Sequence, residues 1–439
     1  MKRLKKILYI NNFFSSYGGA EKTMYNEAKL LKSLGIETYF FATDKQTYFE
    51  KDYKYAEFFP KYVNYRELGI LKSFLCLFKP FYNVEAEKKL DSLLKIVKPD
   101  IIRCCNVRYH LTPSVLKVCR ENNIPVVMSI HDCRLFCPSG NLMQGNRKFC
   151  EKLLCVKDNP IHCVINLCKQ DKLIPSIIVS LEHLFNKACG FHDRIDAYIC
   201  QSESMLELAV ESGISRDKLF LLNTFIPDED FAKRPVYENN SYFLYIGRIS
   251  KEKGIDIFIN AMKSLPEIPV HIIGTGHEEE YYKEFVRKNN LYNIKFMGYK
   301  SGQELEDEYT NCIATVLPCI WFENFPRSIL ESFAYGKPAI ASKIGGIQEI
   351  IDHEINGFTF EVGNVGMLAK YIKQMFYNKE FPRILGQNAR QKAEKKYNSK
   401  EYSEKVMEIY NTVLNKISHS YKAEERAEVQ DIEVGQAIS

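Results

Sequence analysis

The sequence has no long run of apolar residues. None of its apolar stretches approaches the roughly 20 consecutive residues that a membrane-spanning helix needs, so we expect no transmembrane helix. The N-terminal segment MKRLKKILYINNFF starts with basic residues, but its apolar run is only about six residues long and no small-residue cleavage site follows, unlike a secretory signal peptide. We therefore expect a cytoplasmic protein.

The sequence also lacks an excess of either charge. It contains 60 Lys and Arg against 55 Asp and Glu, a net charge of +5 over 439 residues. Nucleic-acid-binding proteins usually carry a stronger basic excess or a basic stripe, so nucleic acid is not an expected partner. Apolar residues make up 46% and charged residues 26%, which is typical of a globular protein with two or three domains.

The order of the expected elements predicts an α/β fold. Short apolar runs such as KILYIN (6–11) and ETYFFAT (37–43) alternate with helical stretches, and a second series of the same kind begins at SYFLYIGRIS (241–250). Strands that alternate with helices indicate parallel sheets covered by helices on both faces. The sequence therefore predicts two doubly wound, Rossmann-like domains that face each other across a cleft, with ligands at the carboxyl ends of the strands.

The expected domain boundaries follow from composition. The segment 226–240, IPDEDFAKRPVYENN, is charged, contains two prolines and is the best candidate for a linker. The remaining divisions are an N-terminal domain (1–225) with a cysteine-rich insertion (133–170), a C-terminal domain (241–381), helices that pack back on the N-terminal domain (382–418), and a disordered tail (421–439).

Three loops that follow expected strands carry glycines or cations. Gly18 and Gly19 precede a helix, where a ligand can approach the backbone and an anion is favoured, although a plain turn is the alternative. Arg248 and Lys253 lie in GRISKEKG (247–254), where both could contact one phosphate group, unless the loop is only a solvated basic turn. Gly274 and Gly276 form a third loop and are candidate substrate-binding residues, but the full GxGxxG motif is absent and NAD binding is not supported.

The strongest motif is ENFPRSILESFAYGKP (323–338). Glu323 and Glu331 lie eight residues apart, and a helix is expected to open near Pro326 and to end at Gly336. Each carboxylate can accept hydrogen bonds from two neighbouring sugar hydroxyls. The backbone N–H groups of Asn324 and Phe325 would be available to a negative group at the helix start. The alternative is a pair of solvated glutamates on an exposed helix.

These motifs, together with the GGAE that starts at Gly18 and the ASKIGGIQEII that follows (341–351), resemble retaining glycosyltransferases of family 4, which have the GT-B fold and act in bacterial polysaccharide synthesis. The resemblance covers roughly residues 5 to 415 and is densest from 243 to 362. It implies that the N-terminal domain holds the acceptor and that the C-terminal domain binds a nucleotide-sugar.

The resemblance also implies roles for individual residues. Arg248 and Lys253 would neutralise the diphosphate, Glu331 would hold the ribose hydroxyls, and Glu323 would contact the donor hexose. The segment Asn324, Phe325, Pro326 and Arg327 would face sugar and phosphate, although the family usually has glycine in place of Asn324 and often in place of Pro326. From the opposite domain, Gly18 and Gly19 would close on the donor, and His131 and Asp132, at the end of IPVVMSIHD, would lie near its sugar.

The resulting hypothesis is a retaining glycosyltransferase that moves a hexose from a nucleoside-diphosphate sugar to a glycan or lipid-linked acceptor in cell-surface polysaccharide synthesis. Its catalytic residues would be His131, Glu323, Arg248 and Lys253, and no cofactor would be needed for catalysis. The alternative is a non-catalytic protein that binds a nucleotide-sugar or glycan on the same scaffold. A phosphorylase is disfavoured because no lysine-centred cofactor signature is present.

A segment rich in Leu and Phe, LGILKSFLCLFKPFY (68–82), contains Lys72 and Lys79. Such a segment can lie on a membrane surface, which would make the protein peripheral on the inner face of the cell membrane. The alternative is a helix packed on the N-terminal sheet.

Six of the 14 cysteines lie between residues 133 and 168. This stretch predicts a long loop at the mouth of the cleft, with few apolar contacts of its own, that covers the acceptor side. A structural zinc ion held by four of Cys137, Cys150, Cys155, Cys163 and Cys168 is one explanation, although no CxxC pair is present. Reduced thiols and disulfides are the other two, and the cytoplasmic setting opposes disulfides.

Overall fold

The computed structural model describes residues 3–15, 18–45, 52–64, 81–145, 148–157, 159–190, 192–231, 233–238 and 241–416. Two predicted features lie largely or wholly outside these residues: the membrane-surface segment 68–82 and the tail 421–439. No helix within the described ranges is long and apolar enough to cross a membrane.

The N-terminal domain is built on a parallel sheet of six strands in the order β2-β1-β3-β4-β7-β8. The four central strands of this sheet are short and almost wholly buried, as expected for a parallel sheet with helices on both faces, and the two edge strands are less buried. Its strands are β1 (Lys6–Asn11), β2 (Glu37–Phe41), β3 (Ile101–Asn106), β4 (Val126–Ile130), β7 (Ala197–Cys200) and β8 (Leu219–Leu221), and its helices include α1 (Gly19–Ser33), α3 (Val84–Val97), α4 (Ser114–Glu121) and α8 (Glu203–Glu211).

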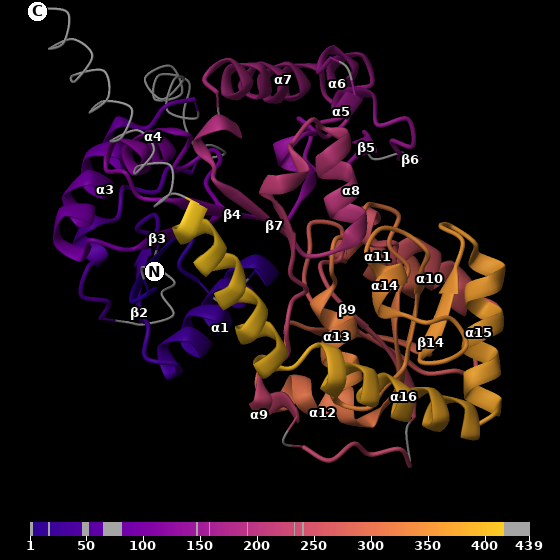
Figure 1. Ribbon diagram of the computed structural model, residues 1–439. Coiled ribbons are helices and arrows are strands. Elements are labelled where there is room, and N and C mark those ends of the chain that lie inside the picture. Colours follow the sequence, from indigo (N-terminus) through magenta and orange to yellow (C-terminus); the bar gives the residue numbers. More distant parts are fainter. Residues whose placement is uncertain are drawn as a thin grey trace, which may run out of the picture.

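The C-terminal domain repeats this plan in a second parallel sheet, with the order β11-β10-β9-β12-β13-β14. The predicted architecture of two doubly wound domains is thus confirmed (Figure 1). Its strands are β9 (Tyr242–Ile246), β10 (Val270–Ile273), β11 (Ile294–Gly298), β12 (Cys312–Leu317), β13 (Ala339–Ser342) and β14 (Gly357–Phe360), and its helices are α10 (Ile255–Met262), α11 (Glu279–Lys288), α12 (Gln303–Asn311), α13 (Arg327–Ala334), α14 (Ile347–Ile350) and α15 (Val365–Tyr377).

The cysteine-rich insertion contains regular structure, so the prediction of a long loop is wrong. A 3-10 turn (Cys133–Leu135) is followed by β5 (Met143–Gln144), β6 (Lys148–Phe149), α5 (Leu154–Lys157) and α6 (Ile161–Ile165), and then by α7 (Leu173–Ala188). The insertion also has apolar contacts of its own, because Cys163, Cys168 and Val179 form a small buried cluster with Cys155 beside it.

The chain crosses between the domains twice. The first crossing follows β8 and contains the short helix α9 (Asp228–Phe231). After α15, helix α16 (Glu380–Lys396) buries Leu385 and Ala393 in the C-terminal domain. Only the next helical segment, 399–416, packs on the N-terminal domain, where Tyr402 and Tyr410 join its core next to α1 (Figure 1).

A buried carboxylate holds this last helix in place. Glu27 of α1 accepts hydrogen bonds from the phenol groups of Tyr9 (3.0 Å), Tyr410 (2.5 Å) and Tyr402, and lies 3.4 Å from Nε of Arg103 in β3. Burial alone would raise the pKa of Glu27, but Arg103 and the three phenol donors outweigh burial and hold the pKa below its ordinary value. The ionised carboxylate therefore links the C-terminal segment to the first domain.

We expect Tyr410→Phe to lower the free energy of unfolding by about 2 kcal/mol, because it removes one donor from a buried charge. Urea denaturation followed by circular dichroism measures this loss. Tyr377→Phe is the matched control, since Tyr377 donates to Glu267 (2.8 Å) at the surface and its loss should leave the free energy of unfolding almost unchanged. Equal losses in the two variants would contradict the role given to Glu27.

Candidate active site

The predicted motifs of the C-terminal domain meet at the carboxyl ends of β9, β10 and β12. Their glycines allow the loops to pack closely: a Cβ on Gly254 would lie 1.8 Å from the carbonyl oxygen of Pro318. A Cβ on Gly274 or Gly276 would lie 2.0 or 1.9 Å from the carbonyl oxygens of Gly247 and Ile249. Gly274 and Gly276 therefore shape the loop that carries Arg248 and Lys253.

Lys253 and Glu323 form an ion pair, with 2.7 Å between Nζ and Oε2. The same carboxylate oxygen accepts a hydrogen bond of 2.6 Å from Nε1 of Trp321. Nζ of Lys253 also lies 4.6 Å from the centre of the Trp321 ring, within the range of a cation–π contact. The sequence analysis missed Trp321, although it is the only tryptophan in the chain and lies two residues before Glu323.

Arg248 also lies near this ring. Its Cζ is 6.0 Å from the Trp321 ring centre, and Nη2 is 2.8 Å from Glu252. The structure thus brings Arg248 and Lys253 together around one indole, as their spacing predicted. Because the Arg248 side chain is 53% exposed, its guanidinium can reorient toward a phosphate.

Glu331, in α13, connects the two domains. Its Oε1 lies 3.0 Å from Nζ of Lys22 in α1 and 3.2 Å from Nη2 of Arg327, and its Oε2 accepts a hydrogen bond of 3.0 Å from Tyr309. Burial would raise the pKa of Glu331, but Lys22, Arg327 and the hydrogen bonds lower it overall, so the carboxylate is ionised. Sequence reasoning did not find Lys22 or Tyr309.

Arg327 faces the glycine pair of the opposite domain. A Cβ on Gly19 would lie 4.0 Å from Cδ of Arg327, and at Gly18 it would collide with Glu21. Nε and Nη1 of Arg327 are buried, and neither has a hydrogen-bond partner within the described part of the chain. Unpaired guanidinium donors beside a glycine turn form an environment that suits an anion.

Asn324 is buried between the sheets. Its Nδ2 donates to the carbonyl oxygen of Ile130 (2.8 Å) at the end of β4, and its Oδ1 accepts from Ser202 (2.9 Å), the N-cap of α8. Nearby, Glu349 of α14 accepts hydrogen bonds from the backbone N–H groups of Glu203 (2.9 Å) and Ser204 (3.1 Å). The side chain that replaces the usual glycine therefore fastens one domain to the other.

The next two residues of the motif, Phe325 and Pro326, make structural contacts. The Phe325 ring is buried and lies 5.6 Å from the ring of Tyr397. Pro326 is the N-cap residue of α13, which starts at Arg327 and ends at Ala334, close to the predicted helix. These contacts fix where α13 begins, and so where Arg327 and Glu331 lie.

His131 lies at the end of β4, beside the Asn324 contact. Burial, together with the charge of Arg103, lowers the pKa of His131 to about 4, so the imidazole is neutral near pH 7. Its Nε2 is buried and has no hydrogen-bond partner among the residues that the structure describes. Asp132 instead caps the following turn, accepting from the Arg134 N–H (3.0 Å) and pairing with Nε of Arg134 (3.2 Å).

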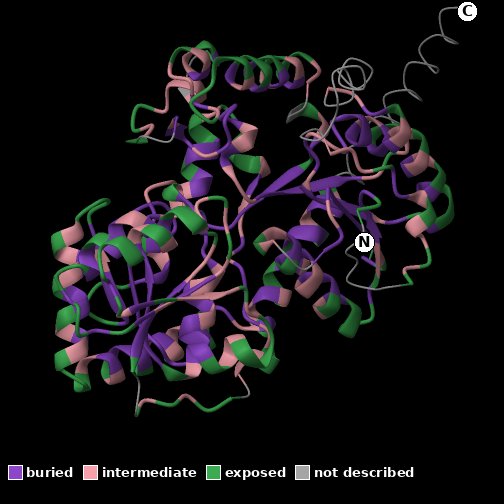
Figure 2. Cartoon of the chain, turned by 180° about the vertical axis from the view of Figure 1, so that it is seen from behind, coloured by how far each residue is buried: buried purple, intermediate pink, exposed green. Residues whose placement is uncertain are grey.

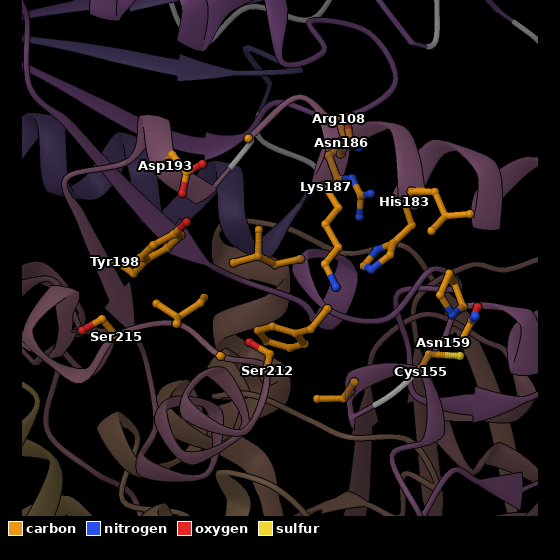
Figure 3. A pocket seen from close by; sticks show the side chains of 18 of the residues that line it. Arg108, Cys155, Asn159, His183, Asn186, Lys187, Asp193, Tyr198, Ser212 and Ser215 are labelled. Carbon is orange, nitrogen blue, oxygen red and sulfur yellow. The ribbon is translucent and has the colours of Figure 1, made fainter.

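One cavity in the N-terminal domain adjoins His131, and a second lies next to the first. A small one of about 40 Å³ is lined by His131, Asp132 and Arg134. A large one of about 570 Å³ lies beneath α7 and is lined by His183 and Lys187 of that helix (Figure 3). Arg108 and Leu135 line both cavities, so the two are neighbours.

The cysteines of the described ranges are all unbonded, and these ranges contain no disulfide. Burial, followed by the neighbouring Cys137 and Cys168, raises the pKa of Cys155 to about 12, so its thiol is protonated. No group of three or more His, Cys, Asp or Glu in the described ranges is arranged to hold a metal ion. The structural zinc ion at Cys137, Cys150, Cys155, Cys163 and Cys168 stays a prediction.

Two protein-family models together match most of the chain. The family model described as Glycosyltransferase Family 4 matches residues 17–230, and the one described as Glycosyl transferases group 1 matches residues 227–392. An uncharacterized glycosyltransferase of Methanocaldococcus jannaschii is 24% identical over 340 residues, which are 76% of this chain and 80% of that protein. The amylovoran biosynthesis glycosyltransferase AmsK of Erwinia amylovora is 25% identical over 226 residues, 47% of this chain and 55% of that protein.

A solved structure shares the fold of the whole chain. HepE of Anabaena, crystallised with UDP and glucose, aligns with a TM-score of 0.59 and 17% identity and covers 96% of this chain and 100% of its own. The match extends across both sheets, and so it includes the way in which the two domains are combined.

We expect the His131 imidazole to titrate with a midpoint of about 4, well below the roughly 6.5 of an unfolded chain. Because the unfolded state binds a proton first as the pH falls, His131 should make the fold less stable between about pH 6.5 and pH 4. NMR titration of the histidine ring protons, assigned by the signal lost in His131→Gln, measures the midpoint. A midpoint above pH 6 would show that the imidazole is solvated.

Proposed function

Because the chain belongs to the family 4 glycosyltransferases and has the GT-B fold, we propose that it transfers a hexose, with retention of configuration, from a nucleoside-diphosphate sugar to a glycan or lipid-linked acceptor in cell-surface polysaccharide synthesis. The observation that carries this proposal is the convergence of Arg248, Lys253 and Arg327 with two ionic carboxylates, Glu323 and Glu331, where the domains meet.

The cations suit the departure of a diphosphate. As the bond between the sugar C1 and the phosphate oxygen breaks, negative charge grows on the diphosphate, and donors fixed in advance stabilise it. Lys253 supplies a point charge beside Trp321, and Arg327 supplies N–H donors that have no protein partner in the described ranges. These groups carry charge without a metal ion, so we propose that none is required.

The two carboxylates suit hydroxyl groups. Glu323 would accept hydrogen bonds from the hexose and Glu331 from the ribose, in place of part of their present contacts with Lys253 and Lys22. The UDP and glucose bound to the Anabaena protein support a donor of this kind. The role of the Erwinia protein in amylovoran biosynthesis supports a polysaccharide product.

The acceptor would approach from the N-terminal domain. The neutral His131, whose Nε2 has no partner in the described ranges, would form a hydrogen bond with the donor sugar at the end of β4. As the acceptor oxygen bonds to C1 on the face that the diphosphate leaves, its proton would pass to the departing phosphate oxygen. A lipid-linked acceptor would place this reaction at the inner face of the cell membrane.

We expect Lys253→Ala to lower kcat/KM at least about 100-fold, the effect of losing a charge-assisted contact of about 3 kcal/mol in the transition state. The matched control is Lys251→Ala, an exposed lysine of the same loop, which should change kcat/KM by less than about twofold. Release of the nucleoside diphosphate from UDP- and GDP-sugars measures both. If the unmodified protein binds these sugars but never releases nucleotide, the protein is a binding protein and not an enzyme.

We further expect the first product to keep the anomeric configuration of the donor and the activity to survive EDTA. One-dimensional proton NMR, recorded early in the reaction, distinguishes the two anomers by the coupling of the anomeric proton. An inverted first product would exclude the retaining mechanism. A loss of activity in EDTA that Mg²⁺ or Mn²⁺ restores would show that a metal ion binds the diphosphate.

A further inference from the structure

The helices at the outer edge of the cysteine-rich insertion are apolar on their exposed side. Helices α6 and α7 adjoin one another at the margin of the N-terminal domain, and α7 is mostly exposed (Figures 1 and 2). Ile174 and Ile165 are 70% and 68% exposed, unusual values for large aliphatic side chains. The outer face consists of Ile161, Ile165, Leu173, Ile174, Ile177, Ile178 and Leu181.

The polar residues of α7 face inward, and specific contacts hold them there. Glu182 is buried and pairs with Nε of Arg108 (3.2 Å), and Ser180 donates to the carbonyl oxygen of Pro160 (3.2 Å). Ser176 is fully buried and accepts a hydrogen bond of 3.0 Å from the Lys169 N–H. Because these contacts fix the rotation of the helix, the apolar stripe must face outward.

The segment that carries this face is basic, with eight Lys and Arg against four Asp and Glu over residues 133–190. Lys172 is exposed just before α7, and Lys148 and Lys152 are exposed in and just after the preceding hairpin. The sole carboxylate of α7, Glu182, is buried on the inner side, and the acidic residues exposed nearby in the described ranges are Glu151, Asp171 and Asp193. The face therefore combines a wide aliphatic stripe with flanking lysines.

This composition indicates a bilayer more than a protein partner. Protein interfaces are depleted of lysine and enriched in aromatic residues and arginine, whereas helices that lie in the membrane interface combine an apolar face with lysines along its border. We propose that the outer face of α6 and α7 lies in the headgroup region of an anionic lipid bilayer. Leu and Ile would enter the acyl boundary and the lysines would meet lipid phosphates.

If α7 lies on the membrane, the cavity beneath it lies next to the bilayer surface. What this means for the acceptor rests on the proposed glycosyltransferase function. His183 and Lys187 project from α7 into the cavity of about 570 Å³ (Figure 3), and Arg108 lies between that cavity and the one beside His131. With α7 at the membrane surface, the polar head of a lipid-linked acceptor could enter this cavity while its lipid stays in the bilayer. The cavity then leads toward His131.

The test is sedimentation of the full chain with vesicles, which requires no sugar donor. The protein should bind vesicles of phosphatidylcholine with about 30% phosphatidylglycerol, and should bind vesicles of pure phosphatidylcholine at least about tenfold more weakly. Ile174→Glu with Ile178→Glu should weaken binding to the anionic vesicles at least about tenfold. The matched control is Ile96→Glu with Ile384→Glu, since these residues are exposed on α3 and α16, and it should bind as the unmodified chain does.

Several results would overturn the proposal. The proposal fails if the unmodified protein does not bind anionic vesicles, or if the α7 variant binds them as strongly as the unmodified protein does. It also fails if the protein is a dimer in solution that only the α7 substitutions dissociate, because the face would then bind a second copy of the chain. Release of nucleotide in solution, measured in the same variants, separates the two hypotheses. If nucleotide release is absent in every protein but the vesicle results hold, only the glycosyltransferase proposal fails.

Discussion

The buried amide of Asn324 is the contact on which the geometry between the domains depends. It bonds to the end of β4 and to the N-cap of α8, and its own backbone lies between Glu323 and the start of α13. A buried amide that loses its partners costs free energy, so rotation of one domain away from the other, which would break these hydrogen bonds, is opposed. Glycine at this position would offer no such bond, and domain rotation would then meet less resistance.

The site balances its charges before any ligand arrives. Lys253 is paired with Glu323, Arg248 with Glu252, and Arg327 and Lys22 share Glu331. Such pairing offsets part of the free energy that burial costs the charged groups. A nucleotide-sugar would separate the two members of each ion pair, since its phosphates attract the cations and its hydroxyls donate hydrogen bonds to the carboxylates. Recognition is then an exchange of partners, and little of the side-chain framework needs to move.

The sequence predicted the parts of the site that depend on strand order, and missed those that depend on tertiary contact. Arg248, Lys253 and Glu323 each follow a strand of one parallel sheet, so their proximity could be inferred. The pairing of Lys22 with Glu331 joins residues 309 positions apart, which no local pattern encodes. Helix α7 formed no part of the prediction, since the apolar pattern of LIPSIIVSLEHLFNKA does not show which face is buried.

The contact of Glu27 with Tyr402 and Tyr410 has a consequence for how the protein is made. Glu27 and Tyr410 are separated by 383 positions, and ribosomes add about 5–20 residues per second. Because about 190 residues separate the end of β8 from Tyr410, the completed first domain waits about 10 to 40 s for the phenol groups that complete the surroundings of its central carboxylate. During this interval Glu27 relies on Tyr9 and Arg103 alone, and the apolar surface that the last helix covers remains open to chaperones.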